Sequence, residues 1–166
     1  MTINIALECL STPEQMNADG VVGLGFHDKI AVFKDDAALF HAMASGCPNC
    51  WSPKTQKWWD ESYGWAGPGT YKYEVVEHTR FGKCLLINGG KPIIARNKNP
   101  NQGGRRILSE VFCHPGGTGR NKEWRGSGGC PTLPVDTFRS FISLFEVGGR
   151  GFFFLVDYLT PRLFYV

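Results

Sequence analysis

The sequence has no long hydrophobic run and carries little net charge. Its longest apolar runs, such as residues 152–156, have the length of a buried strand and fall far short of the roughly 18 residues of a membrane-spanning helix. The net charge of +3 over 166 residues is too small to indicate nucleic-acid binding on its own. We therefore predict neither a membrane span nor a nucleic-acid partner.

The chain also lacks the basic start and long apolar stretch of a signal peptide, since it begins MTINIALECLSTPEQ. We expect synthesis in a cytoplasm, where disulfides are disfavoured even though six cysteines would permit them. A protein of this kind that acts outside that compartment would need a route other than an N-terminal signal.

Motifs for phosphate and nucleotide binding are missing as well. The glycine-rich stretch GGTGRNKEWRGSGG contains no G-x-x-x-x-G-K-[ST], because Lys122 is followed by Glu123. No G-x-G-x-x-G stands between a predicted strand and a helix, and no repeat or low-complexity segment occurs. We predict no cofactor.

Glycine and proline are abundant instead, with 21 and 10 residues, and they predict many turns and more strand than helix. The length suits one domain over residues 1–166, with weak periodicity up to about residue 25. Strands are predicted at 29–33, 70–79, 83–89, 92–96, 107–114 and 151–159, and a strand or short helix at 37–46. Residues 134–147 form the one predicted helix, with Val135, Phe138 and Phe145 on one face and Gly148 at its end. The fold class is therefore mostly β.

Two segments have unusual compositions. Residues 47–69 hold four of the five tryptophans and are predicted to form either a lid packed on the core or a platform for a ligand. Residues 96–125 hold seven Lys or Arg against two Glu, which suits an anionic ligand or, equally, a solvated loop surface.

The cysteines admit several interpretations. Cys47 and Cys50 have the spacing of half a zinc site, but Cys113 and His114 are adjacent and point to opposite faces of a strand, so we predict no metal. The same pair lacks the following helix of a redox motif, which leaves a local disulfide or two unlinked thiols. Cys84 and Cys113 lie inside apolar strands and are predicted to be core thiols.

Cys130 fits a thiol nucleophile better. It precedes the predicted helix, whose positive end would favour a thiolate. The preceding glycines permit a sharp turn, so that the N–H groups of Gly129 and Cys130 could converge on an oxyanion. His114 leaves a strand end into the same loop and is the candidate base. His27, His41 and His78 are interpreted as surface or structural residues.

These residues resemble the signature of the L,D-transpeptidase catalytic domain. His114 is followed after fifteen residues by Cys130 within Ser127-Gly128-Gly129-Cys130, and WAGPGTYKY (65–73) is similar to the family's Gly-Thr-Tyr strand entry. The resemblance covers about residues 64–157, whereas residues 1–63 match only as divergent strands and a Trp-rich lid. It implies a β-sandwich or barrel-like fold with the main helix after the cysteine.

The resemblance also implies roles for individual residues. Cys130, His114, Ser127 and Gly129 would be catalytic, although Ser127 equally suits a small residue in a tight turn. Substrate contacts would come from Arg125, Arg120, Gly128, Thr132, Trp65 and Tyr71. Two positions depart from the family: Gly128 stands where a histidine is frequent, and Thr132 where an arginine is common. Arg105 or Arg106 could replace that arginine, as could Arg120 or Arg125.

The implied activity is acyl transfer on peptidoglycan stem peptides through a cysteine thioester. It would be L,D-carboxypeptidase, endopeptidase or transpeptidase chemistry at the cell wall or periplasm. Without a signal peptide or wall-binding module, a toxin, antibacterial effector or phage endolysin fits best, delivered to a target cell or released at lysis. Such a protein would have delivery machinery and an immunity protein as partners. Two non-enzymatic alternatives are a glycan- or polymer-binding module and a structural part of a phage or secretion particle.

Overall fold

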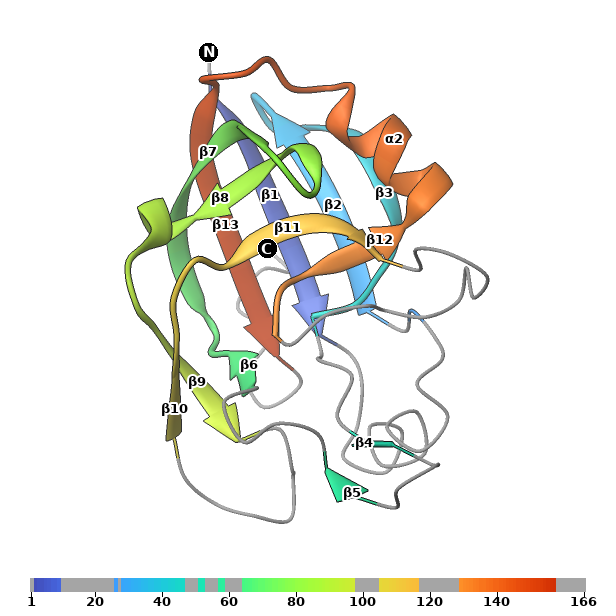
Figure 1. The fold of residues 1–166 in the computed structure, drawn as a ribbon. Helices are drawn as coiled ribbons and strands as arrows, with labels where there is room; N and C mark the ends of the chain where they lie inside the picture. Colours follow the sequence, from blue (N-terminus) through green and yellow to red (C-terminus); the bar gives the residue numbers. More distant parts are fainter. Residues whose placement is uncertain are drawn as a thin grey trace.

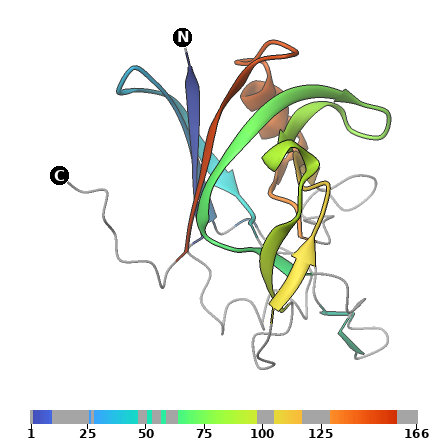
Figure 2. The same cartoon turned by 90° about the vertical axis from the view of Figure 1, so that its left-hand side faces the viewer.

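The computed structural model describes residues 2–9, 26, 28–46, 51–52, 57–58, 64–97, 105–116 and 129–157. Most of them lie in an eight-stranded sheet with the order β12-β11-β8-β7-β13-β1-β2-β3. The sheet curls strongly, so that β8, β11 and β12 cross in front of the strands that follow β7 in the order (Figure 1). The side view shows how far β7 arches between the two halves (Figure 2).

The elements have the following bounds. The large sheet contains β1 (Ile3–Cys9), β2 (Asp28–Lys34), β3 (Ala37–Ala44), β7 (Gly69–His78), β8 (Gly82–Ile87), β11 (Phe112–Gly116), β12 (Thr132–Pro134) and β13 (Arg150–Asp157). A second sheet has the order β10-β9-β6, with β6 (Gly64–Ala66), β9 (Ile93–Asn97) and β10 (Arg105–Leu108). Strands β4 (Trp51–Ser52) and β5 (Lys57–Trp58) form a third, η1 (Asn88–Gly90) is a 3₁₀ turn, and α2 (Val135–Ile142) is a helix.

A bridge between the two ends of the strand order makes the large sheet barrel-like. The backbone of Ser45, just after β3, exchanges two hydrogen bonds with Thr132 of β12, at 2.7 and 2.8 Å. Tyr73 also joins distant parts, because its hydroxyl donates to the Ile3 carbonyl at 2.7 Å. The mostly β, barrel-like fold with one helix among the described residues agrees with the sequence prediction.

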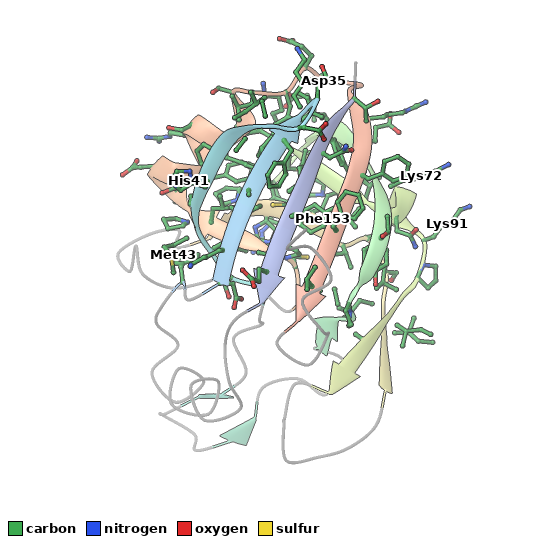
Figure 3. All side chains as sticks on the ribbon, turned by 180° about the vertical axis from the view of Figure 1, so that it is seen from behind. Asp35, His41, Met43, Lys72, Lys91 and Phe153 are labelled. Carbon is green, nitrogen blue, oxygen red and sulfur yellow. The ribbon has the colours of Figure 1, made fainter. Side chains whose placement is uncertain are left out.

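The core fills the inside of this sheet and the face of α2. Alternate residues of β2 point inward, as its alternating apolar pattern requires, and Ile30 and Val32 are fully buried. Phe141 of α2 packs 5.9 Å from Phe40 of β3, and Phe145 meets Tyr73 edge to face at the same distance. The opposite face is solvated, with His41 and Met43 standing out from β3 (Figure 3).

Three predicted elements differ from the structure. Residues 3–9, which were not predicted as a strand, form β1, because they gain β2 and the distant β13 as neighbours. The predicted strand 107–114 is two strands in different sheets, since Glu110 adopts a left-handed φ of 53° between them. The helix ends at Ile142, and the chain continues in tighter turns in which Phe145 N–H donates to the Ile142 carbonyl at 3.3 Å.

No helix among the described residues is long and apolar enough to cross a membrane.

Candidate functional site

The candidate site lies where β11 runs parallel to β12 (Figure 1). His114 pairs with Thr132 in this ladder, and its N–H donates to the Pro131 carbonyl at 3.2 Å. Cys130 immediately precedes Pro131, and its Sγ accepts the Phe112 N–H at 3.5 Å. Phe112 and His114 are alternate residues of one strand and so share a face. The structure thus brings the segment that carries Cys130 alongside the strand that carries His114.

Gly129, directly before Cys130, has a backbone conformation that favours glycine. Its φ of 149° lies in a region that residues with a side chain rarely adopt. A glycine is therefore required here for a backbone reason. The predicted use of the Gly129 and Cys130 amides as an oxyanion site stays a prediction.

The His114 ring is enclosed and held in one tautomer. Only 3% of the residue is exposed, and its Nδ1 lies 2.9 Å from the Pro115 carbonyl oxygen. Because a carbonyl oxygen only accepts hydrogen bonds, Nδ1 carries the proton of the neutral ring and Nε2 carries the lone pair. Nε2 is therefore the nitrogen that can take up a proton.

Burial also determines the charge of His114. Desolvation lowers the pKa of His114 to about 4, with smaller contributions in the same direction from Arg80 and His78, while the Pro115 carbonyl acts in the opposite direction. The imidazole is consequently neutral at pH 7. It can act as a base, but a resting ion pair with a thiolate is disfavoured.

This low pKa predicts acid destabilisation. The unfolded chain binds the His114 proton near pH 6.5 and the folded chain near pH 4, so stability falls as the pH drops through this window. The full loss is about 3 kcal/mol at 1.36 kcal/mol per pKa unit. Urea unfolding at pH 7 and pH 4.5 measures most of this loss, with His114→Gln as the control that lacks it. An equal loss in both proteins would contradict the assignment to His114.

Two further thiols lie close to Cys130. Cys84 and Cys113 are fully buried, free and, as predicted, part of the core. Burial raises the pKa of Cys84 to about 11, with smaller contributions from Glu77 and then Cys130. Burial also raises the pKa of Cys113, and Cys130 and Cys84 add to that shift. Both therefore stay protonated near neutral pH, and Cys130 is the half-buried member of the three.

The predicted help from the helix is wrong. Strand β12 stands between Cys130 and Val135, the first residue of α2. An extended strand advances about 3.3 Å per residue, so the helix begins well beyond the single turn over which its dipole acts. The local donor to the Cys130 sulfur is instead the Phe112 N–H.

The predicted substrate contacts are distributed unevenly. Thr132 lies beside His114 but is fully buried, so a substrate would reach it only after its surroundings move. The Tyr71 hydroxyl donates to the Gly67 carbonyl at 2.6 Å, and Tyr71 pairs with Phe153 of β13. It lies five residues along β7 from Val76, which pairs with Cys84. The structure does not bring Tyr71 to His114. The backbone of Trp65 pairs with Arg96 in the second sheet.

Several predicted residues fall outside the described part of the chain. They are Arg120, Arg125, Ser127, Gly128, Cys47 and Cys50, together with most of the Trp-rich stretch. Arg105 and Arg106 belong to β10, in the second sheet. No group of three or more potential metal ligands occurs within the described residues.

Thr132 yields a stability prediction. Its Oγ1 is buried and has no hydrogen-bond partner among the described residues. An unsatisfied buried hydroxyl is destabilising by about 1–3 kcal/mol, and valine has nearly the same shape without it. Thr132→Val is therefore expected to stabilise the protein by about 1 kcal/mol in chemical unfolding. Thr132→Ser, which keeps the hydroxyl, serves as the control, and a destabilised valine variant would show that the hydroxyl has a partner.

Residues without a predicted catalytic or binding role surround His114. Phe81 stacks on its ring at 4.1 Å, and His78 contacts both Phe81 and Phe112 at 4.8 Å. The Arg80 guanidinium lies 5.4 Å from the centre of the Phe81 ring. The only signal in the sequence is the turn after His78, where Gly82 opens β8, and it does not indicate which strand the turn faces.

The structure is similar in fold to solved L,D-transpeptidases. One from Stackebrandtia nassauensis aligns with a TM-score of 0.46 at 14% identity, over 96% of this chain and 58% of its own. L,D-transpeptidase 1 of Mycobacterium tuberculosis gives 0.40 at 12% identity, over 93% and 62%. The Ldtfm–avibactam carbamoyl enzyme gives 0.37 at 11%, over 93% and 49%. The chain thus spans about half to three-fifths of the length of these proteins. A scan against protein-family models gives no match, and a search of curated proteins gives no significant one.

Proposed function

We propose that this protein is a peptidoglycan-acting cysteine enzyme that cleaves or exchanges the L,D bond of stem peptides through a thioester on Cys130. The observation that supports it best is the hydrogen bond from Phe112 N–H to Cys130 Sγ, since Phe112 lies two residues before the neutral His114 in the same strand. The His114-x(15)-Cys130 spacing within Ser-Gly-Gly-Cys supports the same chemistry.

The reaction has two acyl-transfer steps. In the first, the Cys130 thiol gives its proton to Nε2 of His114 while Sγ attacks the carbonyl carbon that joins the L-centre to the following D-residue. The amide C–N bond breaks, and the leaving amine takes the proton from Nε2. In the second, water or an amine attacks the thioester, gives its proton to Nε2, and Sγ leaves and regains that proton.

The low pKa of His114 affects how the proton moves. A neutral thiol is a far weaker acid than an imidazolium with a pKa of about 4, so complete transfer before attack is uphill. Proton transfer is therefore concerted with attack on the carbonyl. The Phe112 N–H stabilises the negative charge that develops on sulfur.

The biological setting that we favour is a wall-damaging effector or lytic enzyme acting on a target cell. Water is then the acceptor, and the products are stem peptides without their terminal D-residue or with split cross-links. Transpeptidation and D-amino-acid exchange are the same chemistry with an amine as acceptor.

The experiment that tests the proposal identifies both product and intermediate. Folded protein is incubated with purified sacculi, and the released muropeptides are identified by mass. Intact-protein mass spectrometry with a tetrapeptide stem is expected to detect an acyl adduct that peptide mapping places on Cys130, and prior alkylation with iodoacetamide should prevent it. Unchanged muropeptides and no adduct would refute the proposal and favour the non-catalytic alternatives.

A further inference from the structure

The turn between β7 and β8 forms a cover over His114. His78 and Gly82 are the last pair of the β7–β8 ladder, which leaves three residues, 79–81, in the loop. Gly82 has a left-handed φ of 67°, which glycine adopts without the strain that a side chain would bring. The Nδ1 of His78 accepts the Arg80 N–H at 3.1 Å and braces the loop from within. The loop is thus built to hold Phe81 in a fixed place.

The Phe81 ring stacks almost parallel on the His114 imidazole. The two rings are 4.1 Å apart at an angle of 6°, whereas Phe81 meets Phe112 at 6.0 Å and 57°. The bond from Nδ1 to the Pro115 carbonyl holds one edge of the imidazole but leaves the ring able to rock about that bond. A flat ring stacked on its face removes that freedom.

We propose that Phe81 is a positioning residue for His114: its ring fixes the plane of the imidazole and excludes water from that face. The inference rests on the proposed function for its catalytic consequence, but its structural part stands on the stacking geometry. The direction in which Nε2 points, relative to the segment that carries Cys130, is thereby fixed. Misplacement of a base by even 1 Å lowers a rate about 100-fold, so this constraint is chemically significant.

The groups around His114 favour the neutral ring that Phe81 protects. On the β7–β8 hairpin, Arg80 and His78 both disfavour protonation. The protonated Cys84, on the neighbouring strand β8, also lies near His114. Cys130 lies at the opposite edge of β11 from β8, where it accepts the Phe112 N–H. Among the described residues, no carboxylate contributes to the pKa shift of His114. Removing the aromatic cover would admit water, and the charged imidazole would become easier to form.

The test compares Phe81→Leu with Phe81→Tyr. Leucine keeps apolar volume but not the flat ring, while tyrosine keeps the ring. The pKa of His114 is measured by NMR titration, with the resonance assigned from His114→Gln. In Phe81→Leu it is expected to rise by at least about one unit from its wild-type value, while Phe81→Tyr stays near wild type. Phe152→Leu, which makes the same change at an exposed phenylalanine of β13, controls for a general effect of losing an aromatic ring on the structure.

Kinetics on stem peptides supply the second readout. Phe81→Leu is expected to lower kcat about tenfold with little change in KM, and to move the acid limb of the pH profile upward with the His114 pKa. An unchanged His114 pKa, or an equal loss in Phe81→Tyr, would overturn the inference. A wild-type protein that is inactive on stem peptides, yet shows the NMR shift in Phe81→Leu, would refute the proposed function and leave the stacking role intact.

Discussion

Replacement of Cys130 by alanine is expected to lower the rate of stem-peptide cleavage at least about 10³-fold, because loss of the nucleophile removes the whole thioester route. The variant should keep its fold, since Cys130 is half-buried and a small side chain replaces it. The rate is followed by mass spectrometric detection of the released D-residue, and folding by the thermal transition.

Matched controls come from the other two described thiols. Cys84→Ala and Cys113→Ala remove equally sized groups from the neighbouring strands, and burial keeps both thiols protonated. Each is expected to destabilise the protein by about 1 kcal/mol or more through a small cavity, and to leave the rate per folded molecule within a few-fold of wild type. A Cys130→Ala variant as active as the wild type would instead favour a binding module. A Cys113→Ala variant without activity would indicate that Cys113, in β11, is the nucleophile.

The sequence predicted the fold class because its strands follow local patterns. The alternation of 29–33 and the aliphatic run of 83–87 each determine a strand without help from distant residues. Residues 3–9 were missed because their strand depends on β13, more than 140 residues away along the chain. The break at Glu110 was missed because a left-handed glutamate is rare and has no sequence signal.

In the candidate site, too, local features are predictable from the sequence and those that depend on strand pairing are not. Cys130 and His114 are recognisable from residue type and spacing, and so is the need for a glycine at 129. The donor to Cys130 and the cover on His114 are not, because both depend on strand pairing. Phe112 N–H reaches the sulfur only because of where the segment before β12 lies against β11, and Phe81 reaches the imidazole only because β8 pairs with β11. Local chemistry is readable in a sequence, whereas its supporting contacts come from topology.

Gly151 is the position where a single methyl group is expected to have the largest effect on stability. It lies on β13 opposite Tyr73, beneath the hydrogen bond from the Tyr73 hydroxyl to the Ile3 carbonyl. A Cβ at this position would overlap the Ile3 carbonyl oxygen and lie 2.7 Å from the Tyr73 ring. The obstacle is backbone of a paired strand, so no rotamer change relieves it, and β1, β7 and β13 would have to separate.

Gly151→Ala is therefore expected to destabilise the protein by about 4 kcal/mol, at the upper end of the effects of single substitutions. For a chain of this size the transition temperature should fall by about 10 °C or more. Gly148→Ala is the matched control, because its Cβ would meet nothing within 4 Å and only its φ of 81° is unfavourable. That left-handed conformation costs about 1 kcal/mol, so the control should retain most of the stability. Equal losses in the two variants would contradict the prediction, because Gly151 has no left-handed φ and only the close approach of β1 to β13 makes a Cβ unfavourable there.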